Sequence, residues 1–203
     1  SDQIIRELQR EGNNIRPRRQ VVSVIFSDIR GFSAMAETME PEDLGDMLNH
    51  RYFSPLDNII YESNGTLDKH IGDNIMGVFG APVAYEDDAV RAVMSALQMR
   101  EAMKIMNERV GREGREISIG IGISTGEVIA GIFGSSRKKE YTVLGPTVNL
   151  DSRLERLAKV NQILICEDTY RHVQQCVRAE KIALPPMRGI ERRLDVYSVL
   201  EAM

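Results

Sequence analysis

Two aspartates lie where predicted β-strands end, and their chemistry suits a magnesium site. Asp28 follows the apolar run 21–26, and Asp73 lies in the turn of a hairpin predicted over residues 65–80. Two carboxylates with few other protein ligands fit Mg²⁺, which usually keeps several waters and takes further ligands from substrate phosphates. Two such ions can activate a hydroxyl and neutralise a polyphosphate during in-line displacement. Alone this indication is weak, because an isolated aspartate in a turn is more often a turn former.

A second pair, Asn149 and Arg153, lies on the helix predicted after Gly145 and Pro146. Side chains four residues apart share one face of a helix, so both are expected to point the same way. There the guanidinium can stabilise charge on a phosphoryl group while the amide orients a sugar. The alternative interpretation is a surface helix whose arginine pairs with Glu155 or with solvent.

Other chemistries lack their motifs. The sequence has no P-loop for phosphate binding and no serine nucleophile elbow. The histidines His50, His70 and His172 form no metal-binding motif, and Cys166 and Cys176 match no metal spacing. We interpret both cysteines as reduced thiols without a catalytic role.

The composition is that of an ordinary globular domain. The chain has 203 residues, 42% hydrophobic and 28% charged, which suffices for one domain with its own core. Its net charge of −4 argues against a general nucleic-acid-binding protein, which would be basic. No apolar run approaches the ~18–20 residues that span a bilayer, and no signal peptide is present. We therefore expect a cytoplasmic domain that binds neither nucleic acid nor membrane itself.

The N-terminal segment is predicted to be an appendage. Residues 1–19 have apolar residues at helical spacing followed by a basic, proline-broken tract, and residues 20–203 form the remainder. We interpret 1–19 as a helix and linker from an upstream region. Because the chain starts at Ser1 without Met, we expect a piece of a longer protein, which leaves room for a membrane-anchored parent.

Three helices are predicted from apolar spacing. The first covers 41–53 and is expected to kink or restart at Pro55, with Ser54 as its new N-cap. The second covers 86–110, where alanine, valine and methionine recur at steps of three and four. These methionines are expected in the core rather than at a ligand site. The third is capped by Thr147 and runs to residue 159.

Strands are predicted around these helices. Isoleucines alternate with small residues over 117–123, so one strand face is apolar and the other is nearly bare, open to close approach by another element. Further strands are expected at 127–133 and 140–144, with short ones at 163–166 and 195–200. The order predicts an α+β fold, with helices on a mostly antiparallel sheet.

Three segments, in this order, closely resemble the catalytic domain of class III adenylyl and guanylyl cyclases. They are Val24–Ser33, Gly65–Asp73 and Tyr141–Glu155. The resemblance extends over about residues 18–200. It implies the family's ferredoxin-like βααβ-βαβ core and a head-to-tail homodimer with two shared active sites.

The resemblance also implies roles for individual residues. One subunit would supply the metal site, with two Mg²⁺ ions for which Mn²⁺ can substitute, and the other subunit would supply the rest. By position, the metal ligands are Asp28, Asp73 and the carbonyl of Ile29; the base-reading pair is Lys69 and Thr142; the pair acting on the transition state is Asn149 and Arg153. A basic residue near the C-terminus would contact the polyphosphate. Arg188 is the candidate, with Arg192 and Arg193 close by.

The base-reading pair favours ATP over GTP. Lysine is a pure donor and suits the N1 acceptor of adenine, whereas guanine carries a hydrogen at N1. Thr142 can accept from the adenine amino group. We therefore expect an adenylate cyclase that makes 3′,5′-cyclic AMP and pyrophosphate as a second-messenger enzyme. The alternatives are a guanylyl cyclase and a module that binds nucleotide without turnover; the diguanylate cyclase signature is absent.

Three features distinguish this chain within the family. The combination of Lys69 and Thr142 resembles the subgroup often stimulated by bicarbonate, so bicarbonate regulation is a hypothesis. Asp151 stands where the family commonly has a small residue and is expected to add negative charge near the phosphate site. Pro55 interrupts a helix that is usually continuous. Because neither change removes a catalytic group, altered regulation is expected rather than inactivity.

Overall fold

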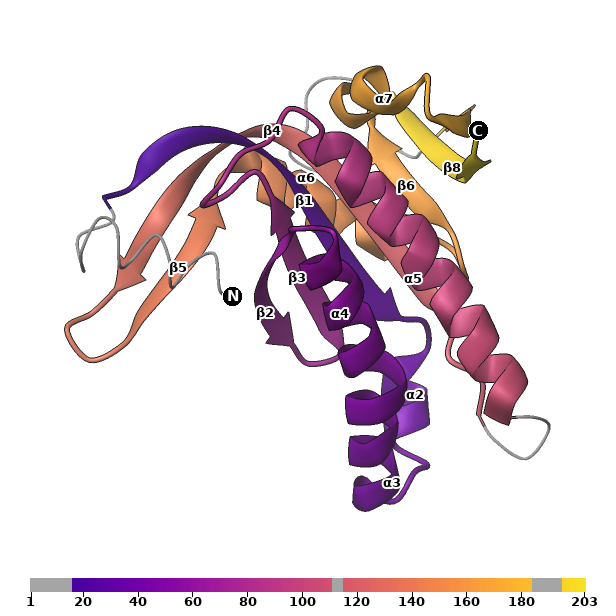
Figure 1. Cartoon of the computed structure of the whole chain (residues 1–203). Coiled ribbons are helices and arrows are strands. Elements are labelled where there is room, and N and C mark those ends of the chain that lie inside the picture. Colours follow the sequence, from indigo (N-terminus) through magenta and orange to yellow (C-terminus); the bar gives the residue numbers. More distant parts are fainter. Residues whose placement is uncertain (1–15, 111–114, 184–194) are drawn as a thin grey trace.

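The computed structural model describes residues 16–110, 115–183 and 195–203. Their strands form one twisted sheet in the order β2-β3-β1-β4-β6-β8-β7, with β5 paired to β4 (Figure 1). The strands are β1 (Arg18–Ile29), β2 (Thr66–Ile71), β3 (Asn74–Phe79), β4 (Ile119–Gly134), β5 (Lys139–Leu144), β6 (Ile163–Cys166), β7 (Val177–Ile182) and β8 (Val196–Ala202). Among these pairs only β4 and β6 are parallel.

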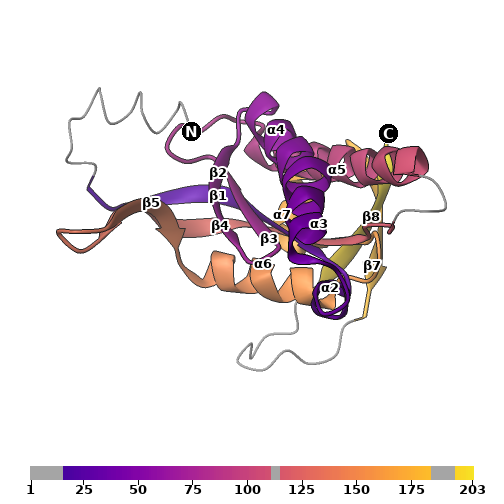
Figure 2. The same ribbon diagram turned by 90° about the horizontal axis from the view of Figure 1, so that it is seen from below.

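Helices cover both faces of this sheet. They are α2 (Phe32–Ala36), α3 (Pro41–Asp46), the π-helical segment η1 (Met47–Phe53), α4 (Ser54–Glu62), α5 (Asp88–Val110), α6 (Pro146–Leu157) and α7 (Glu167–Val173). Figure 2 shows α4 and α5 on one face and α6 on the other. The prediction of an α+β fold with a mostly antiparallel sheet flanked by helices is confirmed.

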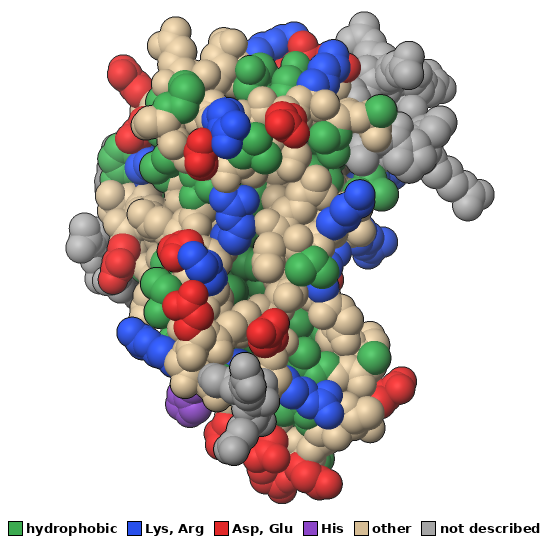
Figure 3. Space-filling view, turned by 90° about the vertical axis from the view of Figure 1, so that its right-hand side faces the viewer, with side chains coloured by type: hydrophobic (Ala, Val, Ile, Leu, Met, Phe, Trp, Pro, Cys, Tyr) green, Lys and Arg blue, Asp and Glu red, His purple; other side chains and the backbone are tan. Residues whose placement is uncertain are grey.

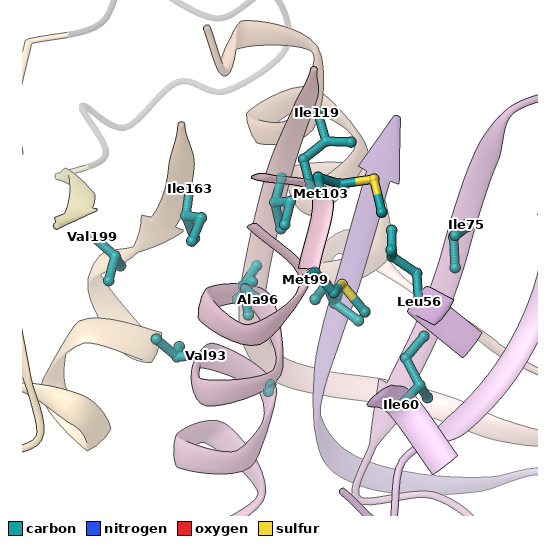
Figure 4. Close-up of a cluster of buried hydrophobic side chains, with 14 of the residues drawn as sticks. Leu56, Ile60, Ile75, Val93, Ala96, Met99, Met103, Ile119, Ile163 and Val199 are labelled. Carbon is teal, nitrogen blue, oxygen red and sulfur yellow. The ribbon is translucent and has the colours of Figure 1, made fainter. Parts of the chain in front are cut away.

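The main core lies between the sheet and the helices α4 and α5. Leu56 of α4 and the methionines Met99 and Met103 of α5 converge there (Figure 4). Both methionines are fully buried, as the helical spacing predicted. Burial of side chains of this size contributes about 1.5–3 kcal/mol each, so this interface anchors α5 on the sheet.

Strand β4 is longer than expected. The sequence predicted separate strands at 117–123 and 127–133, but β4 runs without a break from Ile119 to Gly134. It pairs with the whole of β1 over residues 119–130 and with β5 over residues 129–134, so β5 extends the pairing past the start of β1. The β4–β5 pair therefore forms an arm that projects past the rest of the sheet (Figures 1 and 2). The break was wrongly predicted because Ser124–Gly126 are small and polar, yet they stay paired with β1.

The bare face of β4 receives helix α6. A Cβ atom added at Gly122 would lie 2.6 Å from the carbonyl oxygen of Asp151 and 2.5 Å from the nitrogen of Glu155. Any larger residue would push the helix away. The expectation that another element approaches the glycine face closely is thus confirmed.

The helical stretch 41–62 differs from its prediction. No break occurs at Pro55: the chain continues from α3 through the π-helical segment η1 into α4, and Ser54 has helical dihedral angles rather than those of an N-cap. Proline clashes with the carbonyl one turn earlier in a regular helix. The wider π turn that precedes Pro55 gives the ring room without ending the helix.

The predicted N-terminal appendage is described only in part, whereas most of the predicted C-terminal strands can be compared with the structure. Residues 1–15 lie outside the described residues, while Arg18 and Arg19, placed in the predicted linker, belong to β1. Towards the C-terminus, the strands β6 and β8 match their predictions, whereas α7 and β7 were missed.

The described residues were also searched for a membrane-spanning helix. Within those ranges, no helix is both long and apolar enough to cross a membrane. On the face in Figure 3, acidic and basic side chains are interspersed over most of the surface, and acidic side chains gather at its lower end.

Candidate active site

The two predicted metal-binding aspartates lie side by side. Asp28 is at the end of β1, and Asp73 is in the turn that joins β2 to β3. Because β1 and β3 pair antiparallel, with Ser27 opposite Ile75, the end of one strand meets the start of the other. The backbone N–H of Ile29 donates a 3.1 Å hydrogen bond to Asp73 Oδ2, which fixes that carboxyl beside Asp28.

The electrostatics of this carboxyl pair fit a divalent cation. Burial raises the pKa of Asp28. Burial, together with the hydrogen bond and charge of Asp28, raises the pKa of Asp73 to about 6. Two neighbouring carboxyls disfavour each other's ionisation, and a cation between them would reverse that effect. Their oxygen donors, with the carbonyl of Ile29, are ligands that suit Mg²⁺ or Mn²⁺.

Behind the metal pair lies an ion-pair network that the sequence did not predict. The guanidinium of Arg30 is 3.5 Å from Asp28 Oδ2 and forms a close ion pair with the buried carboxylate of Glu155 on α6. It also donates 3.2 Å hydrogen bonds to the carbonyls of Glu155 and Ala158. Asn74 donates to the other oxygen of Glu155 at 3.3 Å. The network therefore joins the metal pair to the C-terminal end of α6.

Helix α6 presents Asn149 and Arg153 on one face, as predicted. Asn149 is exposed and Arg153 is half-buried, while the buried face of the helix includes Leu154 and Glu155. Within the described part of the chain, neither Asn149 nor Arg153 has a side-chain hydrogen bond or ion pair. The alternative that Arg153 pairs with Glu155 is wrong, because Glu155 pairs with Arg30.

The N-terminal end of α6 is also built differently from its prediction. Gly145, not Thr147, holds the N-cap position. Thr147 Oγ1 instead donates a 2.9 Å hydrogen bond to the carbonyl of Glu127 on β4. The helix is thus attached to β4 at its first turn and to Arg30 at its last.

The two residues predicted to read the base, Lys69 and Thr142, lie in a second cluster, formed by β2 and β5. Thr142 Oγ1 donates a 2.9 Å hydrogen bond to Asp68 Oδ2. Lys69 Nζ donates a 3.0 Å hydrogen bond to Glu140 Oε2 and lies 3.6 Å from Asp68 Oδ2. Although desolvation opposes it, the hydrogen bond to Glu140 and the charge of Asp68 raise the pKa of Lys69, so the ammonium form is favoured.

The structure thus gathers the predicted residues into separate groups. No hydrogen bond or ion pair between described residues joins Lys69 or Thr142 to Asp28 or Asp73. The sequence missed Arg30, Glu155, Asp68 and Glu140; their only signal was their position within or beside the three cyclase-like segments. Arg188, the candidate for the polyphosphate, lies outside the described residues.

The comparison with known families decides what this geometry belongs to. A sequence model of the adenylate and guanylate cyclase catalytic domain matches residues 16–200. This chain belongs to that family. The resemblance inferred from the three segments is confirmed, as is the expectation that the chain is a cyclase enzyme.

Individual cyclases show the same relationship. An adenylate cyclase of Anabaena cylindrica is 33% identical over 189 residues, which are 88% of this chain and 36% of that protein. The crystal structure of the adenylyl cyclase CyaB from P. aeruginosa has a TM-score of 0.88 at 33% identity, covering 93% of this chain and 97% of that chain. The guanylyl cyclase Cya2 has a TM-score of 0.87 at 33% identity, covering 92% and 95%. Both structures confirm the class III cyclase fold.

The cyclase domain accounts for a fraction of the related proteins. This chain spans 36%, 9% and 28% of the length of the first three curated relatives, all of which are named adenylate cyclases.

Proposed function

We propose that this cyclase domain converts ATP to 3′,5′-cyclic AMP and pyrophosphate. The observation that carries the proposal is the adjacency of Asp28 and Asp73, held together by the Ile29 N–H at a strand end. The hydrogen-bonding character of Lys69 and Thr142 favours ATP as the nucleotide. Lys69 is a charged donor, which suits N1 of adenine and opposes the N1–H of guanine.

Each residue group has a distinct task in the reaction. The ribose 3′-oxygen forms a bond to the α-phosphorus, the bond from that phosphorus to the pyrophosphate oxygen breaks, and the 3′-hydroxyl proton leaves to solvent. Asp28, Asp73 and the Ile29 carbonyl would hold two divalent ions, which supply acidification of the hydroxyl and neutralisation of the triphosphate. Asn149 orients the ribose, and Arg153 stabilises the charge that grows on the α-phosphoryl oxygens.

We further propose that two copies of the chain complete each other's sites head to tail. Asn149 is exposed and Arg153 half-buried on α6, and neither has a side-chain partner among the described residues; no hydrogen bond or ion pair in that part of the structure joins them to Asp28 or Asp73 of the same chain. A second copy would bring its metal pair to the first copy's helix. Two-fold symmetry would then form two equal active sites.

The test of the function is cyclic-nucleotide formation by the purified domain. ATP and GTP are supplied in parallel with Mg²⁺ or Mn²⁺, across protein concentrations, and with or without bicarbonate at fixed pH. We expect cyclic AMP as the main product, with a rate that rises more steeply than linearly with protein concentration. A flat response to bicarbonate would remove the hypothesis of bicarbonate regulation.

Two results would contradict the proposal in different ways. Cyclic GMP in excess of cyclic AMP would reassign the substrate to GTP. No product from either nucleotide, at concentrations where the protein is dimeric, would favour a module that binds nucleotide without turnover.

A further inference from the structure

A buried carboxylate lies beside the two base-reading residues and has no assigned role. Asp68 directly precedes Lys69 on β2, and 2% of its side-chain surface is exposed. In a regular strand, neighbouring side chains point to opposite faces. Here β2 is irregular: Leu67 pairs with Gly77 and Lys69 with Met76, so Asp68 is an extra residue in the strand. Such a bulge redirects side chains, and it lets Asp68 and Lys69 both approach β5.

The hydrogen bonds of Asp68 determine the direction of the Thr142 hydroxyl. Both polar neighbours of Asp68, the Thr142 hydroxyl and the Lys69 ammonium, approach the same oxygen, Oδ2. An ammonium has only donors, so the carboxylate acts as the acceptor for both. Thr142 has a single hydroxyl proton, and that proton is directed at Asp68. The hydroxyl therefore has only acceptor capacity left for any other group.

We propose that Asp68 is a positioning residue that sets base specificity through Thr142; the proposal rests on the cyclase function proposed above. With Asp68 in place, Thr142 offers an acceptor and Lys69 offers a donor. The adenine edge is complementary, with a donor amino group at C6 and an acceptor at N1. The guanine edge has an acceptor oxygen at C6 and a hydrogen at N1, so both contacts are mismatched.

The same contact fixes the position of the arm that carries Thr142. β5 belongs to the projecting β4–β5 pair, and Thr142 lies opposite Gly131 on β4. The bond from Thr142 to Asp68 crosses from this arm to β2, and the Lys69–Glu140 bond crosses beside it. Asp68 consequently controls both the polarity and the place of the hydroxyl.

The experiment measures how strongly the domain senses the amino group of adenine. Dissociation constants are determined for the 3′-deoxy forms of ATP and of purine riboside triphosphate, which differ only in that amino group and cannot cyclise. We expect the wild type to prefer the adenine form by about tenfold, roughly the effect of one well-placed hydrogen bond. In Asp68→Ala and Thr142→Val, this preference should fall to about twofold or less.

A matched control separates specificity from folding. Asp57 on α4 is likewise a carboxylate bonded to a side chain of β2, with its Oδ1 3.0 Å from His70 Nε2, although 17% of its side-chain surface is exposed. Asp57→Asn should keep the wild-type preference. If Asp68→Ala keeps it while Thr142→Val loses it, Asp68 is merely structural and the proposal is overturned. An absent preference in the wild type overturns it as well.

A second variant tests the direction of the proton. In Asp68→Asn the amide can donate to Thr142, which frees the hydroxyl proton for an acceptor oxygen at C6. The preference for 3′-deoxy-ATP over 3′-deoxy-ITP should then fall by about tenfold. An unchanged preference in a folded variant contradicts the inference. Failure of every nucleotide to bind the wild type would instead contradict the cyclase proposal itself, and the inference would fall with it.

Discussion

At the scale of single residues, burial changes the ionisation of Asp151. The sequence placed a negative charge near the phosphate site. The structure places the Asp151 carboxyl beneath α6, fully buried against β4, with no hydrogen-bond partner among the described residues. Burial raises its pKa well above the ordinary value, so the neutral acid is favoured. The negative charge expected near the phosphate site is therefore absent at low pH, and burial makes ionisation of Asp151 costly at any pH.

Replacing this residue should stabilise the domain. The unfolded chain ionises Asp151 near pH 4, whereas the folded chain retains the proton to higher pH, so the penalty grows as the pH rises above about 4. Asp151→Ala should raise the free energy of unfolding by about 1–3 kcal/mol at pH 8. The gain should shrink towards pH 4.5. Chemical denaturation at both pH values measures this; a gain that does not depend on pH would contradict the burial of a neutral acid.

At the scale of elements, helix α6 is bonded to the rest of the domain at both of its ends. Its first turn is bound to β4 through Thr147, and its last turn is bound to Arg30. Gly120 makes the second attachment fit, because a Cβ atom there would lie 2.7 Å from the Arg30 guanidinium carbon. The helix that carries Asn149 and Arg153 is thus held at both ends by groups outside the helix.

Breaking the second attachment should loosen the helix end. Glu155→Ala leaves the guanidinium of Arg30 without its close partner in a largely buried place, and should lower the free energy of unfolding by about 3–5 kcal/mol. The double variant Arg30→Met with Glu155→Leu should recover much of that loss, since both charges of the close buried pair are removed together. Denaturation curves of Arg30→Met, Glu155→Leu and the double variant give the coupling energy. Simple additivity would indicate that the two residues act independently.

At the scale of the whole molecule, the residues proposed to bind metal and those proposed to act on the transition state lie in separate groups of one chain. The proposed metal pair lies at the ends of β1 and β3, Asn149 and Arg153 lie on α6, and the proposed base-reading residues lie on β2 and β5. A homodimer related by a two-fold axis can bring one copy's metal pair to the other copy's helix. Each chain would then serve two different active sites.

This arrangement predicts complementation between two inactive variants. Asp73→Ala removes a proposed metal ligand, and Arg153→Ala removes the cation proposed to stabilise the transition state. A mixed dimer keeps one site with both groups intact, so an equal mixture should regain about a quarter of the wild-type rate if subunits exchange at random. Cyclic AMP formation before and after mixing measures this. Mixed dimers that form but stay inactive would contradict the shared site.

The features of the fold and site that depend on residues close together in the chain could be predicted from the sequence. The hairpin around Asp73, the core face of α5 and the shared face of Asn149 and Arg153 follow from spacing alone, because they depend on residues close in the chain. The continuous β4 was not predictable in this way. Its small polar residues resemble a break, and only pairing with β1 keeps them extended. The π turn before Pro55 was likewise missed, because proline in a helical pattern ordinarily indicates a kink or an end.

The sequence by itself determined the cyclase family, the α+β class and the identity of the residues proposed to bind metal, base and phosphate, since three local segments carry them in order. The tertiary structure alone decided how those residues are connected. Strand pairing brings Asp28 to Asp73, a bulge turns Asp68 towards Thr142, and the glycine face of β4 lets α6 approach Arg30. These contacts join residues far apart in the chain, so their geometry depends on how the sheet and helices pack.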